Sequence, residues 1–133
     1  MASVLIVEDD TYVHELLIRM LTLRGHKVLA DAFDGMEAVD IFRNLESRPD
    51  IILMDYRMPD MNGIEATKRI IEIDPSAKIL FLSADGTVKD SAIESGACDF
   101  IKKPISCVEI VTFIEKHASE NFHDELTCSC RTQ

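Results

Sequence analysis

Five short apolar segments, each followed by a one-sided helical pattern, constrain the fold of this chain most. Residues 4–7, 51–54 and 79–82 are continuous apolar runs, and residues 27–29 and 99–101 are shorter runs of the same kind. Continuous apolar runs bounded by polar residues are typical of strands that are covered on both faces. The sequence therefore predicts five strands in the interior of a sheet.

Helical patterns fill the intervals between these runs. Apolar side chains recur at helical spacing within residues 13–20, 38–45 and 63–73, a short polar helix is expected at 88–95, and a fifth helix runs from the N-cap Ser106 to about Ser119. Strand and helix thus alternate five times, which requires right-handed crossovers between parallel strands. We predict a doubly wound (βα)5 α/β domain of three layers. Two dipeptides are typical of turns, Asp34-Gly35 and Asn62-Gly63.

Composition narrows the class of protein. The periodicity stops near Asn121, so we expect one domain at residues 1–120 and a flexible tail at 121–133. Fourteen Lys and Arg against twenty-four Asp and Glu give a net charge of −10, which disfavours nucleic acid and anionic membranes as partners. No apolar run approaches the roughly 18 residues of a spanning helix, and a basic leader is lacking, so we expect a soluble cytoplasmic protein.

Cysteines and histidines carry little of the expected function. The four cysteines form no CxxC pair and are interpreted as reduced thiols: Cys98, Cys107, Cys128 and Cys130. A soft-metal site at Cys128, Cys130 and His123 is the less favoured alternative, because the spacing matches no usual zinc pattern. Three histidines are interpreted as surface residues rather than metal ligands: His14, His26 and His117.

Polar side chains follow four of the predicted strands. Glu8-Asp9-Asp10 follows the first strand, Asp55 the third, Ser83-Ala84 the fourth and Lys102-Lys103 the fifth. In an open parallel sheet, ligands bind beyond the carboxyl ends of the strands, where these groups converge. Two unit charges about 4 Å apart repel by roughly 4 kcal/mol at an effective dielectric near 20, so a hard divalent cation such as Mg²⁺ is expected among the acids.

The same groups suit phosphoryl chemistry. A carboxylate held rigidly at Asp55 can act as a nucleophile and form an aspartyl phosphate, while Ser83 and Lys103 can bind phosphoryl oxygens. Each residue also has a plain structural interpretation: Asp9 and Asp10 as helix caps, Asp55 as a turn residue, Ser83 as a hydroxyl with its hydrogen bonds satisfied, and Lys103 as a solvated surface charge. Four complementary groups at four converging strand ends favour a functional site.

Four motifs in register resemble the response-regulator receiver domain of two-component signalling, the CheY-like family. They are VLIVEDD, DIILMDYRMPDMNGIEA, ILFLSA and DFIKKP, and the resemblance spans about residues 3–118. It implies the strand order 2-1-3-4-5 and a single-domain regulator that is phosphorylated on Asp55 by a histidine kinase or phosphotransfer protein and then changes its affinity for a downstream partner. Chemotaxis-type signalling is the commonest task of such single domains. Self-phosphorylation from small phosphodonors and self-dephosphorylation are also implied, without conventional enzyme turnover.

The resemblance also assigns roles to residues. It implies that Mg²⁺ is held by Asp10, Asp55 and the backbone carbonyl of Arg57, with Asp9 orienting a coordinated water. Ser83, the backbone N–H of Ala84 and Lys103 would bind the phosphoryl group. Phe100 falls where the family carries an aromatic that swings inward with Ser83.

Two variable positions suggest a modulating role. Arg57 and Asp85 follow Asp55 and Ser83 by two residues, and we hypothesise that they pair across the mouth of the site and restrict the hydrolytic water. The partner surface is expected on the fourth helix, fifth strand and fifth helix. The fifth helix has more apolar residues than one buried face can hold, so Val108 or Phe113 is expected to be exposed there. A monomer or weak dimer is expected.

Other functions remain open at this stage. A phosphorelay intermediate would use the same residues, and a fragment of a longer transcriptional regulator would need a linker that the tail does not resemble. A haloacid-dehalogenase-type phosphatase would place an acid where Arg57 stands. A flavodoxin would need a hydroxyl-rich phosphate loop where the chain has Glu8-Asp9-Asp10-Thr11.

Overall fold

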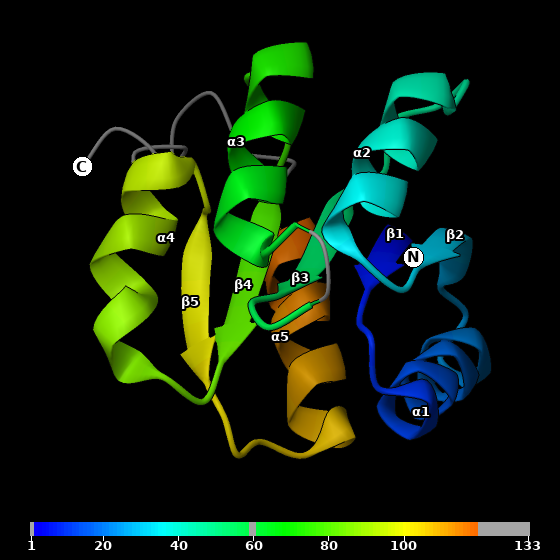
Figure 1. Ribbon diagram of the computed structural model, residues 1–133. Helices are drawn as coiled ribbons and strands as arrows, with labels where there is room; N and C mark the ends of the chain where they lie inside the picture. Colours follow the sequence, from blue (N-terminus) through cyan, green and yellow to red (C-terminus); the bar gives the residue numbers. More distant parts are fainter. Residues whose placement is uncertain (1, 59–60, 120–133) are drawn as a thin grey trace.

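The computed structural model describes residues 2–58 and 61–119, which form a five-stranded parallel sheet with helices on both faces (Figure 1). The strands are β1 (Ser3–Val7), β2 (Lys27–Ala32), β3 (Ile51–Asp55), β4 (Ile79–Ser83) and β5 (Asp99–Lys102). Their order across the sheet is β2-β1-β3-β4-β5, and every pairing is parallel. The (βα)5 fold and the strand order are therefore confirmed.

Five α-helices and one 3₁₀ turn connect the strands. They are α1 (Thr11–Leu23), α2 (Gly35–Asn44), α3 (Gly63–Ile73), the 3₁₀ turn η1 (Gly86–Val88), α4 (Lys89–Ser95) and α5 (Cys107–Ser119). One core cluster joins α2, α3 and α4 to one face of the sheet, and a second joins α1 and α5 to the other. Every residue of β3 and β4 is buried, which explains why these two runs are apolar up to their last residue.

Side-chain caps fix where the helices that lead away from the site begin. The carboxylates of Asp10 and Asp34 and the amide oxygen of Asn62 accept backbone hydrogen bonds at the starts of α1, α2 and α3. Ser106 and Glu109 form a reciprocal capping box at the start of α5, as the sequence predicts for Ser106. The two glycine dipeptides expected as turns are instead an N-cap followed by the first residue of a helix.

The expectation that the histidines lie on the surface is wrong for two of them. His14 and His117 are 1% and 6% exposed, and His26 is half-buried. Each is paired with a carboxylate from another part of the fold: His14 with Asp31, His26 with Glu115 and His117 with Asp99. A buried imidazole needs hydrogen-bond partners, and the separation of these acids from the histidines along the chain hides the pairs from sequence inspection.

The expectations for the cysteines, the tail and α5 fall partly outside the described residues. Cys98 and Cys107 are not joined by a disulfide, whereas Cys128, Cys130, His123 and the expected tail at 121–133 lie outside the described residues. Within the described residues, the structure contains no helix of the length and apolarity that a membrane crossing requires. On α5, Val108 is 50% exposed, and Phe113 packs partly against the second core cluster.

Candidate functional site

The groups predicted to converge lie together at the carboxyl edge of the sheet. Asp55 and Ser83 are the last residues of β3 and β4 and are 5% and 3% exposed, while Lys103 directly follows β5. They share a cavity of about 250 Å³ with the segment that follows β1. Its lining residues are Glu8, Asp9, Asp10, Asp55, Arg57, Ser83, Ala84 and Lys103.

Lys103 provides a positive charge next to the buried carboxylates of this cavity. Its Nζ donates a hydrogen bond to Asp55 Oδ1 at 2.8 Å and lies 3.7 Å from Glu8 Oε1. Burial disfavours the charged amine, but the Asp55 hydrogen bond and the surrounding acids outweigh it and raise the pKa of Lys103. Burial also raises the pKa of Asp55, with Lys103 opposing this effect. Lys103 therefore carries its charge and only partly offsets the cost of a buried carboxylate.

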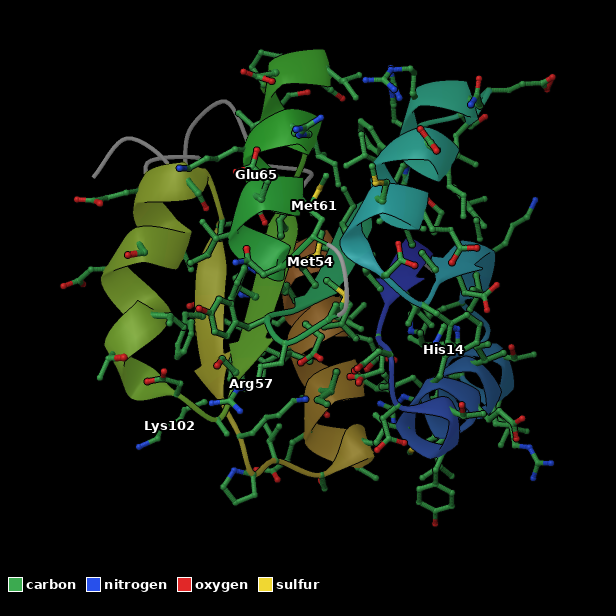
Figure 2. The ribbon with its side chains drawn as sticks, in the orientation of Figure 1. His14, Met54, Arg57, Met61, Glu65 and Lys102 are labelled. Carbon is green, nitrogen blue, oxygen red and sulfur yellow. The ribbon has the colours of Figure 1, made fainter. Side chains whose placement is uncertain are left out.

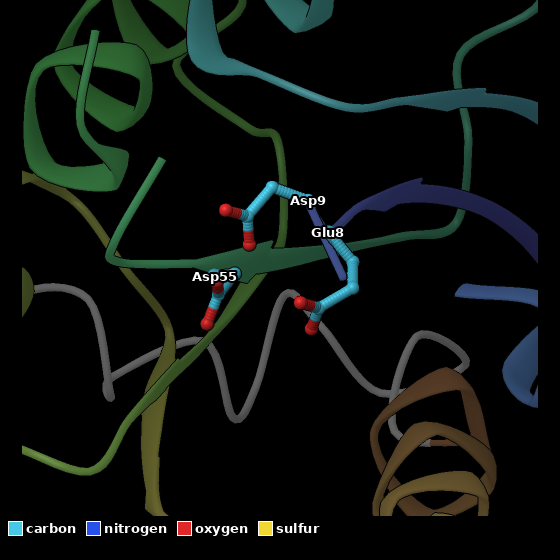
Figure 3. A group of neighbouring side chains, drawn as sticks. All are labelled: Glu8, Asp9 and Asp55. Atoms are coloured by element: carbon cyan, nitrogen blue, oxygen red, sulfur yellow. The ribbon is translucent and has the colours of Figure 1, made fainter. Parts of the chain in front are cut away.

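Three carboxyl groups meet beside Lys103, and they include a residue that the family-based assignment did not use. Ligand oxygens of Glu8, Asp9 and Asp55 all lie within 4.8 Å of one another, around the ends of β1 and β3 (Figure 3). Glu8 is 2% exposed, and burial followed by the neighbouring Asp55 raises its pKa to about 7. The sequence carries this signal, since Glu8 is the first acid after the apolar run of β1.

This acidic group fits a hard divalent cation. Glu8 Oε1 is buried and accepts no hydrogen bond from the described residues. An uncompensated buried carboxylate oxygen is costly, and oxygen donors at this separation are the ligands that Mg²⁺ prefers. One orphaned oxygen and three converging acids therefore make the residues present compatible with Mg²⁺.

Asp10 differs from the other acids. It lines the cavity, but its Oδ1 accepts hydrogen bonds from the backbone N–H groups of Tyr12 and Val13, at 2.9 and 3.1 Å. This carboxylate is the N-cap of α1, which is the plain structural interpretation considered for it. Among the described residues, the acidic group is completed by Glu8 instead.

The capping role of Asp10 leads to a testable expectation. Asp10→Ala should lower the free energy of unfolding by about 1 kcal/mol because two N–H groups lose their acceptor, whereas Asp10→Asn should change it by only a few tenths. Chemical denaturation measures both values. We also expect Asp10→Asn to retain Mg²⁺ affinity in calorimetric titrations, in contrast to Asp9→Asn. An Asp10→Asn variant with Mg²⁺ affinity as weak as that of Asp9→Asn would contradict this distinction.

Ser83 and Ala84 line the cavity at the end of β4. Ser83 Oγ accepts a hydrogen bond from the Asp85 N–H at 3.0 Å, and Ala84 is exposed beside it. On the adjoining strand, Phe100 is half-buried, and its ring centre lies 6.2 Å from that of Phe81. The predicted switch residues Ser83 and Phe100 therefore lie on adjacent strands.

Arg57 lies at the mouth of the site (Figure 2). It is exposed and, with Asp85, also lines an open cleft of about 530 Å³ next to the cavity. Among the described residues, no ion pair within 4.0 Å joins Arg57 to Asp85, so the hypothesised pairing is not a direct contact in this structure. Hydrogen bonds from Thr87 are the main cause of the lowered pKa of Asp85, and Arg57 contributes a smaller effect.

Comparison with known proteins identifies the family. The sequence profile described as "Response regulator receiver domain" matches residues 4–115. The chain belongs to the response regulator receiver family. The receiver is 43% identical to the chemotaxis protein CheY of Thermotoga maritima over 115 residues, which cover 85% of this chain and 94% of that protein. CheY of Bacillus subtilis is 37% identical over 115 residues, which cover 85% of this chain and 94% of that protein.

A solved relative supports the same placement. The receiver resembles a chain of the CheX-CheY-BeF3-Mg complex from Borrelia burgdorferi with a TM-score of 0.79 and 30% identity, covering 86% of this chain and 87% of that one. Receivers of this family are signalling domains that accept and hydrolyse a phosphoryl group and interact with histidine kinases and effector proteins. The family and CheY-type class expected from the motifs are confirmed.

Proposed function

We propose that this receiver accepts a phosphoryl group on Asp55 from a histidine kinase or phosphotransfer protein and then changes its affinity for an effector in chemotaxis-type signalling. The observation that carries the proposal is the Asp55 carboxylate at the end of a buried strand, hydrogen bonded to Lys103 at 2.8 Å and grouped with Glu8 and Asp9. Similarity to CheY proteins supports the chemotaxis assignment.

The residues of the cavity divide the chemistry between them. An oxygen of Asp55 attacks phosphorus, the N–P bond of the phosphohistidine breaks, and the departing imidazole takes up a proton. Lys103, the Ser83 hydroxyl and the Ala84 N–H would donate hydrogen bonds to the phosphoryl oxygens. Glu8, Asp9, Asp55 and the backbone carbonyl of Arg57 would hold Mg²⁺, which supplies positive charge next to the phosphoryl group.

Phosphorylation would be transmitted through Ser83 and Phe100. The Ser83 oxygen accepts from the Asp85 N–H, which leaves its O–H to donate to the phosphoryl group, and Phe100 has no hydroxyl, so its movement depends on packing alone. We assign the effector surface to α4, β5 and α5, where Val108 is 50% exposed. The receiver acts as a monomer or weak dimer.

The domain bounds, the cellular compartment and the class of partner are inferred from the pattern and charge of the sequence. We propose that residues 1–120 form the receiver and 121–133 a tail, and that the protein works in the cytoplasm. The net charge of −10 argues against nucleic acid as a partner.

Phosphorylation can be tested directly. With Mg²⁺ and acetyl phosphate, the intact mass should rise by one phosphoryl group, and Asp55→Asn should abolish this rise because the amide is a poor nucleophile. Asp40→Asn is a matched control, since Asp40 is an exposed aspartate on α2 whose side chain is 71% accessible. EDTA should block the reaction. Full phosphorylation of Asp55→Asn would refute the assignment of the acceptor.

Arg57 should affect the lifetime of the phosphorylated state. Arg57→Ala opens the mouth of the cavity to water, so we expect dephosphorylation to become several-fold faster, as followed by intact mass after removal of the phosphodonor. Asp85→Ala should act in the same direction but less strongly, because its carboxylate mainly caps η1 through Thr87. An unchanged lifetime in Arg57→Ala would rule out this modulating role.

A further inference from the structure

His14 contacts the backbone of Glu8, one of the three acids of the site, and its role is not explained by the phosphoryl chemistry. It is on α1 (Figure 2) and is 1% exposed. Its ring stacks on Phe33 with a centroid distance of 4.1 Å and an interplanar angle of 13°. Burial and stacking on Phe33 therefore restrict the plane of the imidazole ring.

Both ring nitrogens of His14 have short contacts with acceptors. Nδ1–H donates to the backbone carbonyl of Glu8 at 2.7 Å, and Nε2 lies 2.6 Å from Asp31 Oδ2. A carbonyl oxygen can only accept, so Nδ1 carries the hydrogen of its contact with Glu8. His14 is therefore a buried residue that links the end of β1 to β2 through both of its ring nitrogens.

This link completes a closed loop of contacts around Glu8. The Glu8 N–H donates to the carbonyl of Ala32 at 3.1 Å, so both backbone polar groups of Glu8 connect to adjacent residues of β2, one directly and one through His14. The peptide unit is planar, so a fixed Glu8 carbonyl also fixes the nitrogen and Cα of Asp9. The starting points of two acidic side chains are thereby set.

The acidic residues need such a restraint. The carboxylates of Glu8, Asp9 and Asp55 approach within 4.8 Å, and their mutual repulsion favours movement of the Glu8-Asp9 segment away from β3. We propose that His14 is a positioning residue that holds Glu8 and Asp9 in place for a divalent cation, with Asp31 and Phe33 fixing its ring. This inference rests on the proposed function, because it concerns the same cation site.

Two substitutions separate the two hydrogen bonds of His14. The asparagine amide nitrogen can replace Nδ1 and keep the contact with the Glu8 carbonyl, whereas the glutamine amide nitrogen can replace Nε2 and keep only the contact with Asp31. In calorimetric titrations with Mg²⁺ alone, we expect His14→Gln to weaken binding about ten-fold and His14→Asn to remain close to wild type. In EDTA, the Asp10 amide, which donates to Glu8 Oε2, should exchange with solvent faster in His14→Gln than in His14→Asn.

A matched histidine provides the control. His26 also pairs with a carboxylate, that of Glu115 at 2.6 Å, and its other ring nitrogen accepts a hydrogen bond from the Ala2 N–H. Among the described residues, none of its hydrogen bonds is with the acids of the cation site. His26→Asn should lower the melting temperature and leave Mg²⁺ affinity unchanged. If His14→Asn and His14→Gln weaken Mg²⁺ binding equally and only as much as they lower the melting temperature, His14 has a merely structural role and the proposal fails.

One measurement needs no variant. Nitrogen-15 spectra of the wild-type imidazole should show a proton on Nδ1 of His14, and an unprotonated Nδ1 would overturn the proposal even if both variants fail to fold. A wild-type protein that binds Mg²⁺ but is not phosphorylated would refute the proposed function, while the titration and exchange results would still decide the role of His14.

Discussion

Replacing Glu8 with glutamine is expected to make the metal-free protein more stable above pH 7. Burial raises the pKa of Glu8 to about 7, so between the unfolded value near 4.5 and about 7 the native state binds more protons than the unfolded state. Stability from this residue is therefore present at low pH and is lost as the pH rises through that window. The loss is on the order of 3 kcal/mol, and Glu8→Gln should avoid most of it.

Urea unfolding in EDTA between pH 5 and pH 8 measures this difference. The partners of Glu115, Arg24 and His26, lower its pKa to about 2, so Glu115 titrates below this range. The difference between the unfolding free energies of wild type and Glu8→Gln removes the contributions of groups that titrate alike in both proteins. Glu65→Gln is the control, because its carboxylate is on the surface of α3 and is 49% exposed. Mg²⁺ should stabilise wild type more than Glu8→Gln. Equal pH profiles for wild type and Glu8→Gln would contradict a Glu8 pKa raised by burial.

Gly63→Ala is expected to destabilise the protein by about 3 kcal/mol and to reduce phosphorylation of Asp55. A Cβ atom at Gly63 would lie 2.3 Å from the backbone oxygen of Asp55 and 3.1 Å from Cζ of Phe81. The first contact is with main chain at the end of a fully buried strand, so relief requires movement of α3 or of the residue that bears the reactive carboxylate.

Thermal unfolding and acetyl phosphate labelling test this expectation together. Gly86→Ala is the matched control, because a Cβ there meets only the Lys102 side chain at 3.7 Å, an ordinary contact distance. We expect Gly86→Ala to retain a melting temperature near that of wild type. A Gly63→Ala protein with wild-type melting and labelling would show that the close approach of α3 to Asp55 is unimportant.

The alternation of strands and helices could be predicted because it depends on local patterns. Continuous apolar runs such as 51–54 indicate strands buried on both faces, and parallel connection then places every strand end on one edge of the sheet. The convergence of Asp55, Ser83 and Lys103 follows from this topology. Local patterns along the chain are therefore enough to predict the architecture and the edge of the sheet at which the site lies.

The tertiary structure decided how neighbouring acids divide their roles. Three consecutive acids follow β1, but Asp10 faces the first N–H groups of α1, whereas Glu8 lies buried beside Asp55 and Lys103. Likewise, Asp31, the carboxylate that pairs with His14, is 17 residues away on β2. A side chain at position 63 would collide with the backbone carbonyl of Asp55, which explains the glycine there. These outcomes depend on side-chain direction and on contacts between distant segments, which periodicity along a single chain does not encode.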